Sequence, residues 1–291
     1  MSGNTGTGVF KDDGPYTVYI DVNKIAALHE MTTGAGVILG ANVKITDAIH
    51  FLEGSEEEVH QGVAHHLKKI ASYGIRNQGS LGGNLMMKHD HPDFPSDVFL
   101  SLETAGAVVK VMDVSGMFVE VPIGEFLLLD MNRKILVSIR IPILAKVENK
   151  KSLNSLWLHP TSTASSANQQ WKFKSYKIMP RSNNAHAYVN AGFLALVDFA
   201  DSFKIIGKPR LVFGGINESF VHATSTEEFL MGRNMNDHEM FLEAMTILAT
   251  ELVPTDEPVL TSAIYRKQLA LGLFYKVHIF NINNKLLFIT L

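Results

Sequence analysis

Cysteine is absent from all 291 positions of the sequence. The chain by itself therefore offers no disulfide, no thiolate zinc site, no cysteine-ligated iron–sulfur cluster and no cysteine nucleophile. An excess of basic residues is missing too, since 26 Lys and Arg face 29 Asp and Glu, a formal net charge of −3. Without a basic field, and without Lys or Arg clusters between aromatic residues, nucleic-acid binding is disfavoured.

Long apolar runs are also lacking. The apolar stretch at 269–275 ends at Lys276, far short of the roughly 20 residues that span a bilayer. The first six residues have neither the basic nor the apolar region of a signal peptide. With 46% hydrophobic residues, the chain is long enough for one large domain or two ordinary ones. We expect a soluble, cytoplasmic protein without a membrane partner.

The first half of the chain alternates short strands with turns and contains one clear helix. Ser55 and Glu58 form the S-x-x-E pattern of a capping box, apolar residues recur on one face up to Ile70, and Gly74 suits a left-handed C-terminal cap. Mixed strands and helices of this kind favour an α+β fold. The predicted strands are Tyr16–Val22, Gly36–Val43, Ala107–Val114, Met117–Ile123 and Ile135–Ile141.

Between the two halves the composition shifts to Ser, Asn, Thr and Lys, without apolar periodicity. We interpret residues 145–172 as a linker or insertion. After it, strands are predicted at Ala187–Phe199 and Lys204–Phe213, and helices at Asp237–Leu252 and Ser262–Phe280. The expected organisation is a first domain at 1–144, a second at 173–280 and a tail at 281–291.

Two glycine-rich turns are the candidates for binding chemistry. They are Gly3-Asn4-Thr5-Gly6-Thr7-Gly8 and Ser80-Leu81-Gly82-Gly83-Asn84. Glycine lets backbone N–H groups approach a phosphate closely, and Asn and Thr side chains add donors. Neither turn is a Walker loop or a Rossmann fingerprint. Each alone is better explained by an ordinary turn, but the pair suggests a pyrophosphate held from two sides.

Other polar groups are weaker candidates for a binding or catalytic site. The stretch Lys88-His89-Asp90-His91-Pro92-Asp93 could suggest a metal site, but no third or fourth ligand is indicated, so no metal is predicted. The adjacent His65 and His66 are interpreted as a solvated helix edge. Tyr176, Lys177 and Arg181 are interpreted, from spacing alone, as surface residues near the start of a strand. No Ser/His/Asp grouping stands out, and no catalytic residue is predicted.

Taken in order, these motifs resemble the flavin segment of the aldehyde oxidase and xanthine dehydrogenase family, the molybdenum hydroxylases. Gly3-Asn4-Thr5-x-x-Gly8 with Tyr19-Ile20-Asp21-Val22 is similar to the first phosphate loop and following strand, and 75–84 to the second loop. Pro95-Ser96-Asp97 matches the acidic position after it. Leu211–Ile216 and Tyr265–Lys276 resemble the C-terminal lobe. Residues 176–189 look most like insect aldehyde oxidases.

The resemblance implies a two-lobed FAD-binding domain of the PCMH type, also called vanillyl-alcohol-oxidase-like. A CO-dehydrogenase-flavoprotein-like α+β domain would follow. It further implies that the chain is a fragment lacking the first strand and helix. FAD would be bound non-covalently, with the pyrophosphate held by Gly3–Gly8 and Ser80–Asn84. Ile70 would lie near the flavin, Asp97 would accept hydrogen bonds from the ribitol or ribose, Leu136 would pack on the isoalloxazine and Lys177 would approach its reactive region. Gly83 is predicted to have a positive φ, so that Gly83→Val would abolish FAD binding.

Enzymes of this family oxidise substrate at a molybdenum cofactor, and electrons reach the flavin through two 2Fe–2S clusters. These groups would be bound by iron–sulfur and molybdenum domains outside this sequence, in enzymes that are typically homodimers. NAD-using relatives carry acidic residues after the Lys177 position, where this chain has Arg181-Ser182-Asn183-Asn184. Oxygen is therefore the predicted electron acceptor. The alternatives are a xanthine dehydrogenase flavin domain that uses NAD, a separate flavoprotein subunit, or a non-functional truncated product.

Overall fold

The computed structural model describes residues 3–14, 16–144, 168–255 and 261–287. These residues form two compact units. Unit 1 comprises Met1–Ile143 together with Met179–His186, and unit 2 comprises Leu144–Ile178 and Ala187–Leu291. The segment 179–186 is therefore contributed to unit 1 from between two strands of unit 2. Most of the predicted linker, residues 145–167, lies outside the described residues.

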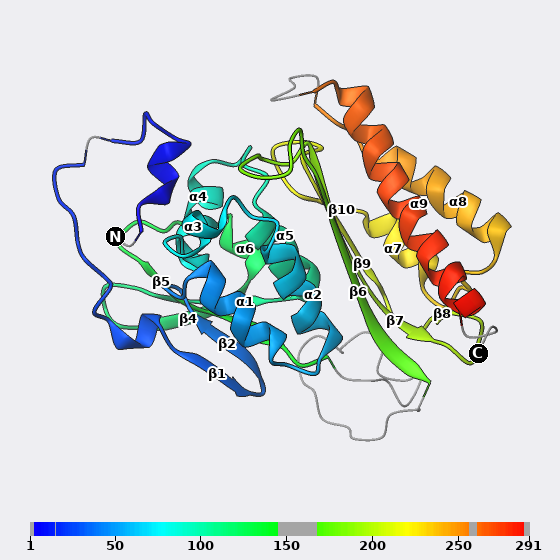
Figure 1. Ribbon diagram of the computed structural model, residues 1–291, viewed down its shortest axis with the longest axis horizontal. Helices are drawn as coiled ribbons and strands as arrows, with labels where there is room; N and C mark the ends of the chain where they lie inside the picture. The colour runs from blue at the N-terminus through cyan, green and yellow to red at the C-terminus, as the bar shows by residue number, and fades with distance from the viewer. Residues whose placement is uncertain (1–2, 15, 145–167, 256–260, 288–291) are drawn as a thin grey trace. The chain divides into compact units, whose positions relative to one another are not determined.

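Unit 1 is built on a five-stranded antiparallel sheet in the order β1-β2-β5-β3-β4 (Figure 1). In the inner strands, buried residues alternate with less buried ones, so that one face of the sheet packs into the core. Val109 and Ile139 are paired directly across β3 and β5, and both are fully buried. The strands are β1 (Met31–Gly34), β2 (Gly36–Gly40), β3 (Val108–Met112), β4 (Phe118–Pro122) and β5 (Ile135–Pro142).

The helices of unit 1 lie mainly between β2 and β3 in the sequence. In α1, Ile45, Ile49 and Leu52 recur at helical spacing and are buried. In α5 all nine residues are buried, which makes it the central helix of the unit. The helices are η1 (Thr5–Gly8), η2 (Ala26–Leu28), α1 (Ile45–Glu53), α2 (Glu58–Leu67), α3 (Tyr73–Arg76), α4 (Leu81–Asp90), α5 (Asp97–Ala105) and α6 (Ile123–Phe126).

Unit 2 has an antiparallel sheet in the order β10-β9-β7-β6, with β8 paired to β7, and three helices on one face (Figure 1). An aromatic cluster fills the space between sheet and helices. The ring of Phe193 lies 5.5 Å from that of Phe213, and the ring of Phe274 lies 5.3 Å from that of Phe241. The elements are β6 (Gln169–Ile178), β7 (Val189–Asp198), β8 (Lys204–Ile205), β9 (Arg210–Gly214), β10 (Val221–His222), α7 (Thr224–Leu230), α8 (His238–Glu251) and α9 (Ala263–Leu287).

Several local predictions are wrong. Tyr16–Val22 has strand-forming residues but forms no strand, and Val18 is 75% exposed. The capping box is not formed, because α2 begins after Glu57 without a side-chain cap and the Ser55 hydroxyl instead accepts from the Glu57 N–H. Ala71, with φ 43°, takes the left-handed conformation expected of Gly74.

Other boundaries shift. The predicted strand Lys204–Phe213 is two strands, β8 and β9, separated around Pro209, which has no N–H to donate. β6 begins at Gln169, inside the segment interpreted as a linker, and α9 continues to Leu287, past the predicted start of the tail. No helix in the described ranges combines the length and apolar character needed to cross a bilayer.

Candidate functional site

The first glycine-rich loop begins with two residues in the left-handed backbone conformation. Gly3 and Asn4 both have positive φ, 65° and 49°, a conformation that costs little for Gly and is tolerated by Asn. They lead into the single turn of η1, where Asn4 provides no side-chain cap. The first N–H groups of such a turn have no partner within the helix. Thr5 and Gly6 therefore present backbone donors that the turn itself does not use.

This loop lies directly against the start of the second one. A Cβ built on Gly3 would come within 2.2 Å of the Gln78 carbonyl oxygen, and a Cβ on Gly79 within 3.3 Å of the Thr5 hydroxyl. Only a residue without a side chain permits the first approach, and Gly3 meets that requirement. The structure thus brings together the two turns that are about 75 residues apart in the sequence.

The backbone N–H groups of the second loop hold it in place by hydrogen bonds within unit 1. The Ser80 hydroxyl caps α4 by accepting from the Gly83 N–H at 3.1 Å. The Leu81 N–H donates to the Val43 carbonyl at 3.1 Å and the Gly82 N–H to the Ala41 carbonyl at 2.8 Å. Because these first-turn donors already have protein partners, the helix N-terminus is used to fix the loop, not to present free N–H groups.

The prediction made for Gly83 is wrong in its geometry. Gly83 lies in the first turn of α4 without a positive φ, and a Cβ there would meet only the Ser80 hydroxyl, at 3.0 Å. The sterically restricted glycine is Gly82, where a Cβ would lie 2.6 Å from the Ala41 carbonyl oxygen and 2.8 Å from the Ala41 Cβ. Close backbone packing, not conformation, requires glycine at that position.

A hydrogen-bonded chain connects the second loop to Asp97. The Ser96 hydroxyl donates to the Asn84 side-chain oxygen at 2.6 Å and accepts from the Phe99 N–H at the start of α5. Asp97, the next residue, is 7% exposed, and its Oδ1 lies 3.3 Å from Nε2 of His66. Sequence reasoning did not single out Ser96, although a Ser before Asp and an apolar run is a typical N-cap pattern.

His66 was wrongly assigned to a solvated edge. Adjacent helical residues point in different directions, and here His65 is exposed whereas His66 is fully buried against Asp97. A buried polar side chain requires a hydrogen-bonding partner, which the Asp97 carboxylate provides. His66 therefore belongs to the surroundings of Asp97.

Two apolar candidates also lie in unit 1. Ile70 is 8% exposed and is followed by the left-handed Ala71, and its carbonyl accepts from Arg76 Nη1 at 2.6 Å. Leu136 is 4% exposed in β5, where it is paired with Val111 next to a register shift. Both side chains are thus largely covered by protein.

Lys177 belongs to unit 2, whereas the loops belong to unit 1. It lies near the end of β6 and not, as predicted, near the start of a strand, and it is paired with the buried Asn190 of β7. Burial raises the pKa of the neighbouring Tyr176 phenol. The Lys276 ammonium lies 5.1 Å from the centre of the Tyr176 ring, a cation–π distance.

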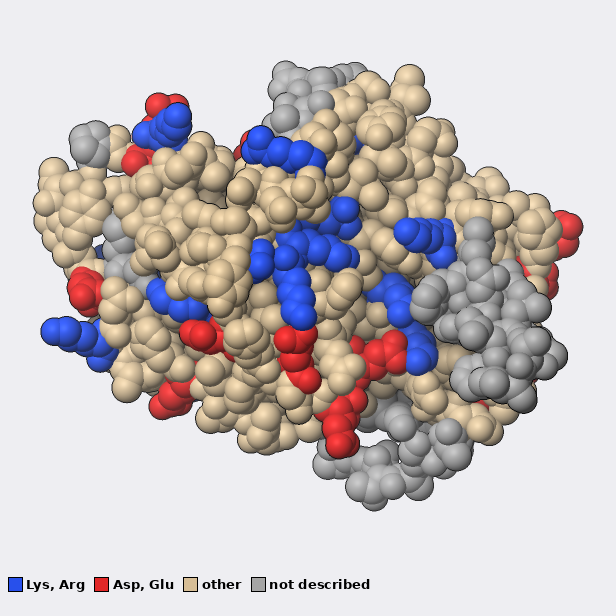
Figure 2. Space-filling model, viewed as in Figure 1, with Lys and Arg blue, Asp and Glu red and all other residues tan. Residues whose placement is uncertain are grey.

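The histidine-rich stretch uses its ring nitrogens within the fold. His89 Nε2 lies 2.8 Å from the Leu129 carbonyl oxygen and its Nδ1 lies 3.0 Å from the Asp90 carboxylate, while His91 Nε2 lies 2.9 Å from Asp13. Among the residues that the structure describes, no group of three or more potential ligands is placed to hold a metal. On the face drawn in Figure 2, basic and acidic side chains of the described residues are interspersed between large neutral areas.

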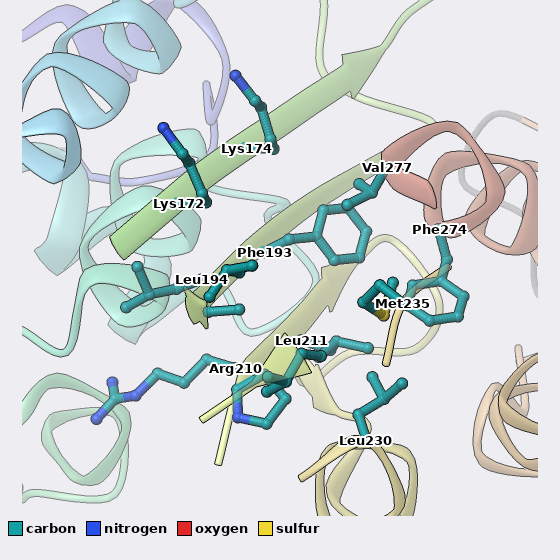
Figure 3. A pocket seen from close by; sticks show the side chains of 14 residues that line it. Lys172, Lys174, Phe193, Leu194, Arg210, Leu211, Leu230, Met235, Phe274 and Val277 are labelled. Atoms are coloured by element: carbon teal, nitrogen blue, oxygen red, sulfur yellow. The ribbon is translucent and has the colours of Figure 1, made fainter. Parts of the chain in front are cut away.

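Unit 2 contains a small apolar cavity between its sheet and its helices. Its volume of about 50 Å³ has room for only a few water molecules. Figure 3 shows Lys172, Lys174 and Arg210 extending away from the apolar side chains that surround it. Because these charged groups do not converge on the cavity, it does not resemble a cofactor site.

Comparisons with known proteins agree with this layout. Residues 1–144 match the FAD binding domain in molybdopterin dehydrogenase, and residues 174–279 match the CO dehydrogenase flavoprotein C-terminal domain. Indole-3-acetaldehyde oxidase of Arabidopsis thaliana is 35% identical over 87% of this chain, and abscisic-aldehyde oxidase of the same plant is 32% identical over 94%. The chain spans only 18% and 20% of their lengths.

The fold has a solved counterpart in quinoline 2-oxidoreductase from Pseudomonas putida 86. The TM-score is 0.69 at 21% identity, over 98% of this chain and 89% of that one. The predicted two-domain α+β fold and the predicted FAD-binding domain are thereby confirmed. The chain consists of an FAD-binding domain followed by a CO dehydrogenase flavoprotein C-terminal domain, and it belongs to the flavin-binding part of the molybdenum hydroxylase family.

Proposed function

We propose that this chain is the FAD-binding, electron-transfer portion of an aldehyde-oxidase-like molybdo-flavoenzyme. The observation that carries the proposal is the direct packing of Gly3, in the Gly3–Gly8 loop, on Gln78, which leads into the Ser80–Asn84 loop. FAD, when bound, would exchange electrons between the iron–sulfur clusters and an external acceptor. The enzyme would be a cytoplasmic homodimer with iron–sulfur and molybdenum domains, and the likeness of 176–189 to insect aldehyde oxidases remains a prediction.

The two loops would have different tasks. The N–H groups of Thr5 and Gly6, which η1 does not use, would donate to the pyrophosphate. The second loop, fixed by Ser80 and by the carbonyls of Ala41 and Val43, would form the wall against which it lies. The remaining predicted contacts would come from Asn84, Asp97, Ile70, Leu136 and Lys177.

FAD binding to the chain tests this assignment. Reconstitution with excess FAD should give a protein with bound-flavin absorbance, released unmodified on denaturation because no cysteine is available for a thioether link. Gly3→Ala should weaken binding at least tenfold, because its Cβ would clash with the Gln78 carbonyl and a positive φ would be strained.

Gly74→Ala is the matched control for that variant. Gly74 has open space around it and no positive φ, so this variant should bind FAD like the parent chain. A parent chain that stays colourless would refute the proposed function. Equal FAD affinity in the parent and Gly3→Ala would remove the first loop from the site.

The composition of the loop after β6 supports oxygen, not NAD, as the proposed electron acceptor. Residues 179–186 contain no Asp or Glu, and the Arg181 guanidinium is engaged within the loop, where its Nε donates to the Asn184 carbonyl at 3.1 Å. Asn side chains bring no charge to orient a dinucleotide. The full-length enzyme should therefore oxidise an aldehyde aerobically without NAD. Fast NADH formation under anaerobic conditions would favour the alternative, a xanthine dehydrogenase type of flavin domain.

A further inference from the structure

The first loop is anchored at its far end by His91, the residue that follows the last turn of the second loop's helix. Directly after Gly8, the chain passes the C-terminal end of α4. There the ring of His91 stacks on that of Phe10, with centroids 3.5 Å apart and planes 5° from parallel. His91 Nε2 also lies 2.9 Å from the Asp13 carboxylate. One imidazole thus contacts the segment 10–13 through both ring stacking and a hydrogen bond.

Hydrogen bonds and ring packing hold the turn that carries His91. The His91 N–H donates to the Met87 carbonyl and the Phe94 N–H to the His91 carbonyl, both at 3.0 Å. The buried Lys88 ammonium donates to the Pro92 carbonyl. Phe94 is 7% exposed and presents its edge to Phe10, with the ring centres 6.1 Å apart. The backbone that carries the His91 ring is therefore held by contacts that do not involve the first loop.

The same helix begins at the second loop. Ser80 caps the first turn of α4 and His91 follows its last residue, so the two features are separated by ten helical residues, about 15 Å. η1 lies beside α4 in unit 1 (Figure 1). A Cβ built on Gly6 would lie 3.4 Å from the Met87 sulfur. At the near end, Gly3 rests on Gln78. The first loop is thus held at both ends by elements that also hold the second loop.

We propose that His91 is a positioning residue for FAD, which sets the first loop at a fixed distance from the second through α4. This inference rests on the proposed function, since it assumes that the Gly3–Gly8 loop binds the pyrophosphate. His91 itself is not assigned a contact with FAD. Its contribution is to reduce the number of loop conformations, and a preorganised loop binds more tightly because less ordering is needed on binding.

The test measures FAD affinity in the 291-residue chain by flavin fluorescence. His91→Ala should weaken FAD binding about tenfold, from the combined loss of an aromatic stack and a hydrogen bond. His91→Phe, which keeps the stack, and Asp13→Asn, which acts from the loop side, should each cause a smaller loss. The exposed His50→Ala on α1 serves as the matched control and should bind like the parent.

Comparing the affinities for FAD and FMN separates an effect on the position of the first loop from a general loss of stability. Because the first loop is proposed to hold the pyrophosphate, His91→Ala should lower the affinity for FAD more than that for FMN, which lacks the pyrophosphate bridge. The melting temperature without flavin should change little in Asp13→Asn. Equal affinity of the parent, His91→Ala and Asp13→Asn would overturn the inference, as would equal losses for FAD and FMN. A parent chain that does not bind FAD would instead refute the proposed function.

Discussion

Gly82 shows how one missing side chain can position a binding loop. Its N–H donates to the Ala41 carbonyl, and the same close approach leaves no space for a Cβ. Gly82→Val should therefore lower the free energy of unfolding by about 1–3 kcal/mol, the usual cost of forcing extra atoms into a packed site. Urea unfolding of the apo chain would measure the change.

The neighbouring glycine provides the control. Gly83→Ala places its Cβ near only the Ser80 hydroxyl, and alanine is a better helix former than glycine by about 0.5–1 kcal/mol. The two effects roughly offset each other, so this variant should unfold within about 1 kcal/mol of the parent. Similar losses in the two variants would contradict the structural difference described between the two glycines.

Individual site contacts were beyond the reach of the sequence. Ser96 and Asn84 are separated by twelve positions, and their hydrogen bond exists only because the N-terminal ends of α4 and α5 meet. His66 was misplaced for a related reason. Two adjacent histidines look alike in a sequence, and only the direction of each side chain separates a buried one from an exposed one.

At the scale of elements, α9 is fixed to the rest of unit 2 by Arg266. This guanidinium is 7% exposed, and it donates from Nη1 to the Gly215 and Ile216 carbonyls at 2.7 and 2.9 Å and from Nη2 to the Thr255 carbonyl at 2.5 Å. Arg266→Met leaves three carbonyls, of which that of Ile216 is buried, without this donor. We expect a loss of about 3 kcal/mol in the unfolding free energy of unit 2.

The control for Arg266 lies two residues away. Gln268 is exposed on the same helix, so Gln268→Ala should change stability by no more than about 0.5 kcal/mol. Guanidinium unfolding followed by circular dichroism would compare the two variants. An Arg266→Met chain as stable as the parent would show that water replaces the guanidinium at these carbonyls.

Elements were predictable where their pattern had one buried face. β3 and β5 alternate buried and less buried residues and were found close to their true bounds. α5 was missed because every residue is buried, which leaves no polar stripe to reveal the helical period. α4 was missed because Gly82 and Gly83 lower helix propensity, and contacts with 41–43 override that preference.

The opposite error occurred at Tyr16–Val22. Its residues have high β-propensity, but a strand also requires a neighbouring strand with which to exchange hydrogen bonds. None of the described strands is paired with this stretch, and Tyr19 and Ile20 are 60% and 71% exposed. Propensity alone therefore overpredicted a strand there.

At the scale of the whole molecule, the two compact units should unfold in separate transitions. Each unit has its own sheet and its own buried core, and units with independent cores commonly depart from two-state behaviour. Differential scanning calorimetry of the apo chain should resolve two heat-absorption peaks. Arg266→Met, a change within unit 2, should shift only one of them, which identifies that peak.

FAD should then raise the midpoint of the unit 1 transition, because the proposed site takes both glycine-rich loops from unit 1. A ligand at about 100 times its dissociation constant stabilises the state that binds it by about 2.7 kcal/mol, which corresponds to an increase of about 5–10 °C for a domain of this size. In Gly3→Ala, whose Cβ would clash with the Gln78 carbonyl, this increase should be smaller than in the parent chain at the same FAD concentration. A unit 1 transition that does not move with FAD in the parent chain would show that the two loops do not bind the cofactor.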